Sequence, residues 1–215
     1  YSEQGQAGNT KSWESAEYLK DWGLTSMNAS TAYALGFNGS GVKIGVMDSG
    51  VLLNHPEFQD GRIHVVKTEG TYSKDGMRYP DASVGNGPIN KNEPVKNGKR
   101  NFDKTDNGVF TKGEAFNIDG TWHKYTNDAH GTHVGGTMAA SRDGNEMHGV
   151  AFGANLYSAN TGGNDNMTYG PNQDYDFFLQ GYSALADAGA KVINNSWGSN
   201  RRVNSSFAGA QGYKP

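Results

Sequence analysis

An aspartate and a histidine in two short motifs are the residues of this 215-residue chain best suited to chemistry. Asp48 lies in V-M-D-S-G (46–50), and His130 lies in D-A-H-G-T-H-V-G-G-T (128–137). A neutral imidazole can take a proton from a nucleophile and return it to a leaving group. It needs an acidic partner on its other ring nitrogen, which fixes the tautomer and stabilises the imidazolium. Asp48 suits that role, because Gly50 permits a sharp turn that lets the carboxylate face the histidine.

Simpler interpretations compete with a catalytic one. Most Asp residues after a strand, and most His residues at a helix start, are structural. His130 and His133, with Asp128 or His148, would also suggest a metal site. Zinc metalloproteases, however, place a Glu directly after the first His and the second His four residues on. Gly131 stands at the position of that Glu, so the sequence predicts no zinc site.

The expected elements that carry these motifs alternate between strands and helices. β-branched residues, with apolar groups on both faces, predict a buried parallel strand over residues 42–47 that ends at Asp48. Small residues predict a slim helix over 130–140 that packs closely on a sheet. The other expected elements are a strand over 156–159, a helix over 173–188 stopped by Gly189, and a second buried strand over 191–197. This alternation predicts an α/β fold with a parallel sheet, which binds ligands beyond the carboxyl ends of its strands.

Two other regions stand apart from this pattern. Residues 15–24 and 28–35 predict short helices, the second capped by Asn28 or Ser30. Residues 67–125 hold few aliphatic side chains and are rich in Gly, Asn, Lys and Asp. Because such a stretch cannot build its own core, we expect a long polar surface insertion there.

The composition excludes several classes of function. The formal net charge of -3 is small and the basic residues are dispersed, so neither nucleic acid nor an anionic membrane is expected as a partner. No apolar run approaches the roughly 20 residues of a membrane span. Cysteine is absent, which excludes disulfides, thiol catalysis and thiolate metal sites. The chain begins at Tyr1 rather than Met, so we expect that upstream residues were removed.

Five motifs in a fixed order resemble those of the subtilisin-like serine proteases, the subtilases. They are V-M-D-S-G, N-H-P-E-F (54–58), H-G-T-H-V-G-G-T, H-G-V-A-F-G-A (148–154) and V-I-N-N-S-W-G (192–198). The resemblance runs from about Gly41 to Gly198, and H-G-T-H-V-x-G-T is its most specific part. The wording of the last two motifs looks most like subtilases of Gram-negative autotransporters. There the protease is a secreted passenger ahead of a membrane β-barrel, which implies a secreted or cell-surface location.

This resemblance implies a fold and a reaction. The fold would be a three-layer α/β sandwich with a mainly parallel sheet flanked by helices. Residues 1–215 would form its N-terminal portion, incomplete at the C-terminal side. The reaction would be peptide-bond hydrolysis by a serine endopeptidase that requires no cofactor. Asp48 and His130 match the triad Asp and His, and His133 matches a histidine that supports structure rather than catalysis.

The resemblance also implies where an extended polypeptide substrate binds. Residues 194–198 match the strand whose backbone pairs with the substrate, which makes affinity partly independent of substrate sequence. The substrate-binding residues would be Asn194, Ser196, Trp197 and Gly198. Trp197 is bulkier than the small aliphatic residue often found there, so it either changes the pocket wall or fills the core.

A structural calcium ion is a further implication of the resemblance, with weaker support. Glu57 falls where many subtilases place a carboxylate ligand, and residues 141–147 match their calcium loop in position and length. Arg142 and Glu146 depart from the usual neutral loop, however, so the sequence favours an ordinary surface turn.

The resemblance ends where a nucleophile is needed. The family segment G-T-S-x-A is absent from the sequence, and no later segment supplies the oxyanion-hole Asn. The interval between Asp48 and His130 is also longer than in many family members. We favour a chain whose nucleophile lies in the remaining C-terminal part of the protease domain. The alternative is a non-catalytic homologue that binds peptides or acts as a chaperone. In either case we expect no proteolysis by this chain alone.

Overall fold

The computed structural model describes residues 5–77, 95–96, 99–100, 109–122, 129–161 and 175–197. Within these ranges a central sheet of four parallel strands has the order β10–β1–β9–β2. The strands are β1 (Lys43–Asp48), β2 (Ile63–Val65), β9 (Asn155–Asn160) and β10 (Val192–Asn194). Because β1 has a neighbour on each side, the carboxyl end that carries Asp48 lies in the middle of the sheet.

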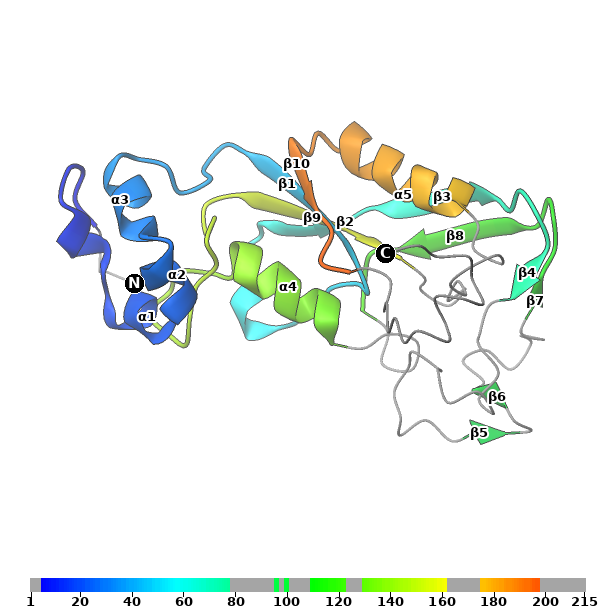
Figure 1. The fold of residues 1–215 in the computed structure, drawn as a ribbon, viewed down its shortest axis with the longest axis horizontal. Helices are drawn as coiled ribbons and strands as arrows, with labels where there is room; N and C mark the ends of the chain where they lie inside the picture. The colour runs from blue at the N-terminus through cyan, green and yellow to red at the C-terminus, as the bar shows by residue number, and fades with distance from the viewer. Residues whose placement is uncertain are drawn as a thin grey trace, which may run out of the picture.

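Helices cover both faces of this sheet (Figure 1). Helix α4 (His130–Ala139) packs on one face and α5 (Tyr175–Asp187) on the other. Successive residues of β1 point to opposite faces, so Val46 joins the core under α4 and Met47 joins the core under α5. The three-layer α/β sandwich expected from the resemblance is therefore present, and the expected helices over 130–140 and 173–188 are confirmed within one or two residues.

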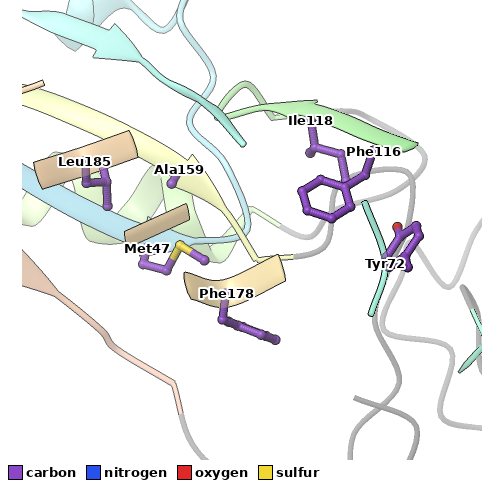
Figure 2. Packing of buried hydrophobic residues seen from close by; sticks show 7 residues of the cluster. All are labelled: Met47, Tyr72, Phe116, Ile118, Ala159, Phe178 and Leu185. Atoms are coloured by element: carbon purple, nitrogen blue, oxygen red, sulfur yellow. The ribbon is translucent and has the colours of Figure 1, made fainter. Parts of the chain in front are cut away.

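The two ends of the expected insertion are part of the core, which the sequence did not predict. Strand β3 (Lys67–Thr71) pairs antiparallel with β8 (Ala115–Asp119). Figure 2 shows Phe116 and Ile118 of β8, and Tyr72 just after β3, which belong to the same core cluster as Phe178 and Leu185 of α5. The buried members from this region are Tyr72, Phe116 and Ile118. The polar composition did not indicate this core because its apolar residues are few. They pack with residues of α5 rather than with other parts of the insertion.

Further into the insertion, two short antiparallel pairs are described. They are β4 (Gly76–Met77) with β7 (Val109–Phe110), and β5 (Val95–Lys96) with β6 (Lys99–Arg100). The other residues between 78 and 108 lie outside the described ranges, so a surface position stays a prediction for them.

The N-terminal residues form short helices with a small core of their own. These are η1 (Thr10–Trp13), α1 (Ala16–Lys20), α2 (Trp22–Ser26) and α3 (Ala29–Ala34), while η2 (Pro56–Phe58) follows β1. The helix expected over 15–24 is broken at Asp21, whose carboxylate accepts from the Gly23 amide at 2.7 Å and so caps α2. Asn28 precedes α3 in the left-handed region, at φ 57°, and makes no side-chain cap. Asn28 thus occupies the expected N-cap position but does not cap the helix through its side chain.

The last described strand is shorter and more exposed than expected. The sequence predicted a buried strand over 191–197, but β10 covers Val192–Asn194 and Val192 is 63% exposed. Among the described strands β10 has β1 as its one neighbour, so it lies at the edge of the sheet that they form.

In the part of the chain that the structure describes, no helix has the length and apolar character needed to cross a membrane.

Candidate active site

Asp48 ends β1 at the point where the chain turns sharply away from the sheet. It lies opposite Asn160, the last residue of β9. Its side chain is 4% exposed, and its Oδ1 accepts a hydrogen bond from the Ser49 amide at 2.7 Å. Gly50 continues the turn at φ 89°, a region that glycine adopts without the strain of a side chain. The turn therefore holds a buried carboxylate in a fixed direction.

The same turn is joined to the N-terminus of α4. The Gly131 amide donates to the Ser49 hydroxyl oxygen at 2.8 Å, and the Leu52 amide donates to the Thr132 hydroxyl oxygen at 3.0 Å. A Cβ atom at Gly131 would lie 2.5 Å from the carbonyl oxygen of Gly50, so a side chain there would force the helix away. The glycine after His130 thus lets α4 approach the turn closely enough for the two motifs to meet.

The result is a direct contact between the two residues singled out by the sequence. His130 Nδ1 lies 2.8 Å from Asp48 Oδ1, a separation typical of a charge-assisted hydrogen bond. The aspartate is buried, whereas the His130 side chain is 49% exposed. If Nδ1–H donates to the carboxylate, Nε2 carries the lone pair that can accept a proton. A base held in one tautomer, with an exposed ring, is what general-base chemistry requires.

The burial of Asp48 strengthens this arrangement. Its Oδ2 is buried and has no hydrogen-bond partner among the described residues. A buried carboxylate with an unpaired oxygen is costly, and a cation beside it offsets that cost. The imidazolium that forms when His130 takes a proton is such a cation. It would lie in direct contact with this carboxylate.

The other histidines considered for a metal site are not brought to this pair. His133 is exposed on α4. His148 is 2% exposed, its Nδ1 lies 2.8 Å from the Gly149 carbonyl, and burial lowers its pKa below the usual value. Aromatic rings of the N-terminal core surround it. Asp128 lies outside the described residues. Within those residues no three His, Asp or Glu side chains are grouped to hold a metal ion.

Three of the predicted substrate-binding residues are described: Asn194 ends β10, and Ser196 and Trp197 follow it. Asn194 is half-buried and donates to the hydroxyl oxygen of Ser196 at 2.8 Å, and Ser196 is exposed. The Trp197 indole donates to the carbonyl oxygen of Met47 at 2.6 Å, and its ring centroid is 5.6 Å from that of Phe178.

Neither expectation for Trp197 describes it fully. It packs on the core through one face, but 39% of the residue is exposed. Gly198 lies outside the described residues. The substrate-binding roles of all four residues remain predictions.

The loop compared with a calcium site is organised around other groups. The backbone amides of Asp143 and Gly144 donate to the Glu17 carboxylate at 3.2 and 2.9 Å. The Arg142 guanidinium lies 5.2 Å from the Trp13 ring centroid and 5.6 Å from that of Phe152. Glu57, the other residue compared with a ligand, lies near Asp143 and Glu17, whose charges add to burial in raising its pKa. A structural calcium ion at this loop stays a prediction.

Sequence reasoning missed one segment of this site, residues 120–122 at the end of the insertion. The Val51 amide donates to the Gly120 carbonyl at 2.9 Å, and the Trp122 amide donates to the Val51 carbonyl at 2.9 Å. These bonds place the end of the insertion against the turn that follows Asp48. No motif marks this segment; the Asp119-Gly120 pair indicates a turn and nothing more.

Comparison with known proteins agrees with the motifs. The family model described as "Subtilase family" matches residues 39–214. Two proteins of Serratia marcescens, each named "Extracellular serine protease", are 35% and 34% identical over 202 residues, covering 92% of this chain. Bacillopeptidase F of Bacillus subtilis is 31% identical over 189 residues, covering 83% of this chain. The chain spans 13% of the length of the Serratia relatives and 10% of that of bacillopeptidase F.

Proposed function

The chain belongs to the subtilase family, and we propose that it supplies the orienting acid and the general base of a secreted serine endopeptidase. The observation that carries this proposal is the 2.8 Å contact between buried Asp48 and half-exposed His130. The residues that would complete the site, a nucleophilic serine and an oxyanion donor, would lie outside this chain.

In the proposed reaction His130 removes the proton of the serine hydroxyl as the oxygen attacks the peptide carbonyl. Asp48 stays ionised, holds the ring and stabilises the imidazolium. His130 then gives the proton to the leaving amine, which yields an acyl-enzyme, and the same two steps with water release the product. Without the nucleophile this sequence cannot begin, so the chain alone is proposed to be inactive.

The proposed substrate class and location rest on the position of residues after β1 and β10 and on the names of the relatives. An extended polypeptide would pair with residues 194–198, of which Asn194 ends β10 opposite Val46 of β1. Secretion from a Gram-negative bacterium, as an autotransporter passenger, is suggested by the words "Extracellular serine protease" in the names of the Serratia relatives.

Labelling with a fluorophosphonate probe tests the proposal on the full-length protein. The wild type should react, and His130→Ala and Asp48→Asn should lose most of the label, because the serine is then no longer activated. His133→Ala is the matched control, since this histidine is exposed on the same helix and should leave labelling intact. No label on the wild type, or a label that survives His130→Ala, would contradict the proposal. Peptide binding without cleavage would then favour the non-catalytic alternative.

A further inference from the structure

The turn after Asp48 is held from two sides. Helix α4 holds it on one side through the Ser49 hydroxyl and the Leu52 amide. On the other side lie residues 120–122, which we name the return segment because the chain passes through it on leaving the insertion. Val51 forms a parallel bridge with Thr121 and exchanges backbone hydrogen bonds with Gly120 and Trp122. The position of the turn therefore depends on the insertion as well as on the helix.

One carbonyl group joins the return segment, the turn and the sheet. The Gly120 oxygen accepts from the Val51 amide at 2.9 Å and from the Ser158 hydroxyl at 2.9 Å. Ser158 belongs to the central strand β9 and is fully buried, at 0% exposure. The Gly120 amide in turn donates to the Val66 carbonyl at 3.0 Å. The carbonyl of Gly120 is thus fixed to the central sheet, and its amide to the residue between β2 and β3.

The packing around this carbonyl leaves no room for adjustment. A Cβ atom at Gly120 would lie 1.8 Å from the carbonyl oxygen of Ser158, and one at Gly50 would lie 2.6 Å from that of Thr121. In addition, the side-chain amide of Asn160 donates to the Thr121 carbonyl oxygen at 3.3 Å. The backbones of the turn, the return segment and β9 therefore lie in close contact here. A small movement of the return segment must therefore be transmitted to the turn.

We propose that Ser158 is a positioning residue, which acts through the Gly120 carbonyl and the return segment to set Asp48 against His130. This inference rests on the proposed function, since it assigns a consequence to the Asp48–His130 contact. Ser158 touches neither the substrate nor the reacting atoms. Its hydroxyl fixes the carbonyl that holds the Val51 amide, three residues after the catalytic aspartate.

Ser158→Ala in the full-length protein tests this role. Without the hydroxyl, the Gly120 carbonyl keeps one bond instead of two, and the turn can shift. A misplacement approaching 1 Å costs up to about 100-fold in rate, so we expect kcat to fall roughly 10-fold while KM stays near that of the wild type. A weaker contact with Asp48 also stabilises the imidazolium less. The acidic limb of the pH profile of kcat/KM should therefore move to lower pH.

Ser30→Ala is the control, because Ser30 is equally buried but lies in the N-terminal helices, where its hydroxyl faces Glu14. It should lower the unfolding temperature without moving kcat or the acidic limb. Ser158→Cys fills the same space with a weaker donor and should fall between the wild type and Ser158→Ala, which guards against a folding failure of the alanine variant.

The outcomes separate this inference from the proposed function. A wild-type kcat and acidic limb in Ser158→Ala would overturn the positioning role, as would equal losses of activity in the Ser158 and Ser30 variants. Activity that survives His130→Ala would instead overturn the proposed function itself.

Discussion

Replacing Gly131 with alanine is expected to separate His130 from Asp48, although alanine favours a helix more than glycine does. On propensity alone the exchange stabilises a helix interior by about 1 kcal/mol. At Gly131 a steric clash opposes this gain. The added Cβ would lie 2.5 Å from the Gly50 carbonyl oxygen and 2.9 Å from the Gly50 nitrogen. Both are backbone atoms of the turn, so no rotamer change can relieve the contact.

The size of the effect follows from these distances. Ordinary contact for a Cβ begins at 3.4 Å, so α4 must move about 0.9 Å from the turn if the turn stays fixed. The His130–Asp48 separation of 2.8 Å would then grow to about 3.7 Å, beyond hydrogen-bonding distance. We expect kcat/KM to fall by about 100-fold and the domain to lose about 1–3 kcal/mol through overpacking.

Gly136→Ala is the matched comparison in the same helix. No atom lies within 4 Å of its would-be Cβ, so this variant should gain up to about 1 kcal/mol and keep its activity. Both variants would be measured in the full-length protein by thermal unfolding and by cleavage of a peptide substrate. Activity of Gly131→Ala within a few-fold of the wild type, or unfolding temperatures that shift in the same direction, would refute the argument.

Three further predictions concern stability. Burial lowers the pKa of His148 below its usual 6.5, so its contribution to stability is complete above about pH 6.5 and falls as the pH drops; His148→Gln should remove that part of the slope in calorimetric unfolding between pH 7 and 5. Burial, and then the charges of nearby carboxylates, raise the pKa of Glu57 above its usual 4.5. Its ionised form therefore costs stability as the pH rises through that range. Glu57→Gln should raise the unfolding temperature at pH 7 and leave it unchanged near pH 4, and an equal rise at both would contradict this cause. Trp197→Phe keeps the ring beside Phe178 but loses the bond to the Met47 carbonyl, so denaturant titration should show a loss of about 1 kcal/mol and a larger loss in Trp197→Leu.

Sequence patterns predicted the elements whose own residue types and periodicity indicate a strand or a helix. The strand that ends at Asp48 and the helix that begins at His130 carry their signals locally, in β-branched and small residues. The β3–β8 pair was missed because its core residues, Phe116 and Ile118, pack with a helix that comes much later in the chain. The extent of β10 was overestimated because an apolar run does not reveal where backbone pairing ends, which for β10 and β1 is at Asn194.

The sequence predicted which two residues form the candidate site, but not the contacts that hold them in place. The order of the motifs resembles that of the subtilases, which led us to expect Asp48 beside His130. The 2.8 Å contact agrees with that expectation. Ser158 and Gly120 could not be found in this way. Their importance comes from one shared carbonyl between distant segments, and neither residue type is unusual in a strand or a turn.

The position of β1 in the sheet also affects when the contact between Asp48 and His130 can form during synthesis. The ribosome makes β1 early, but both strands that flank it come from far downstream, with Ile44 pairing with Leu156 and Val192. The Asp48–His130 contact closes a loop of 82 residues, and the Trp197–Met47 contact one of 150. Contacts that distant form slowly, because the entropy of closing the loop is lost before they stabilise the fold. We therefore expect Asp48 and His130 to remain apart until the chain that supplies β9 and β10 has been made, so that the growing polypeptide holds no assembled acid–base pair.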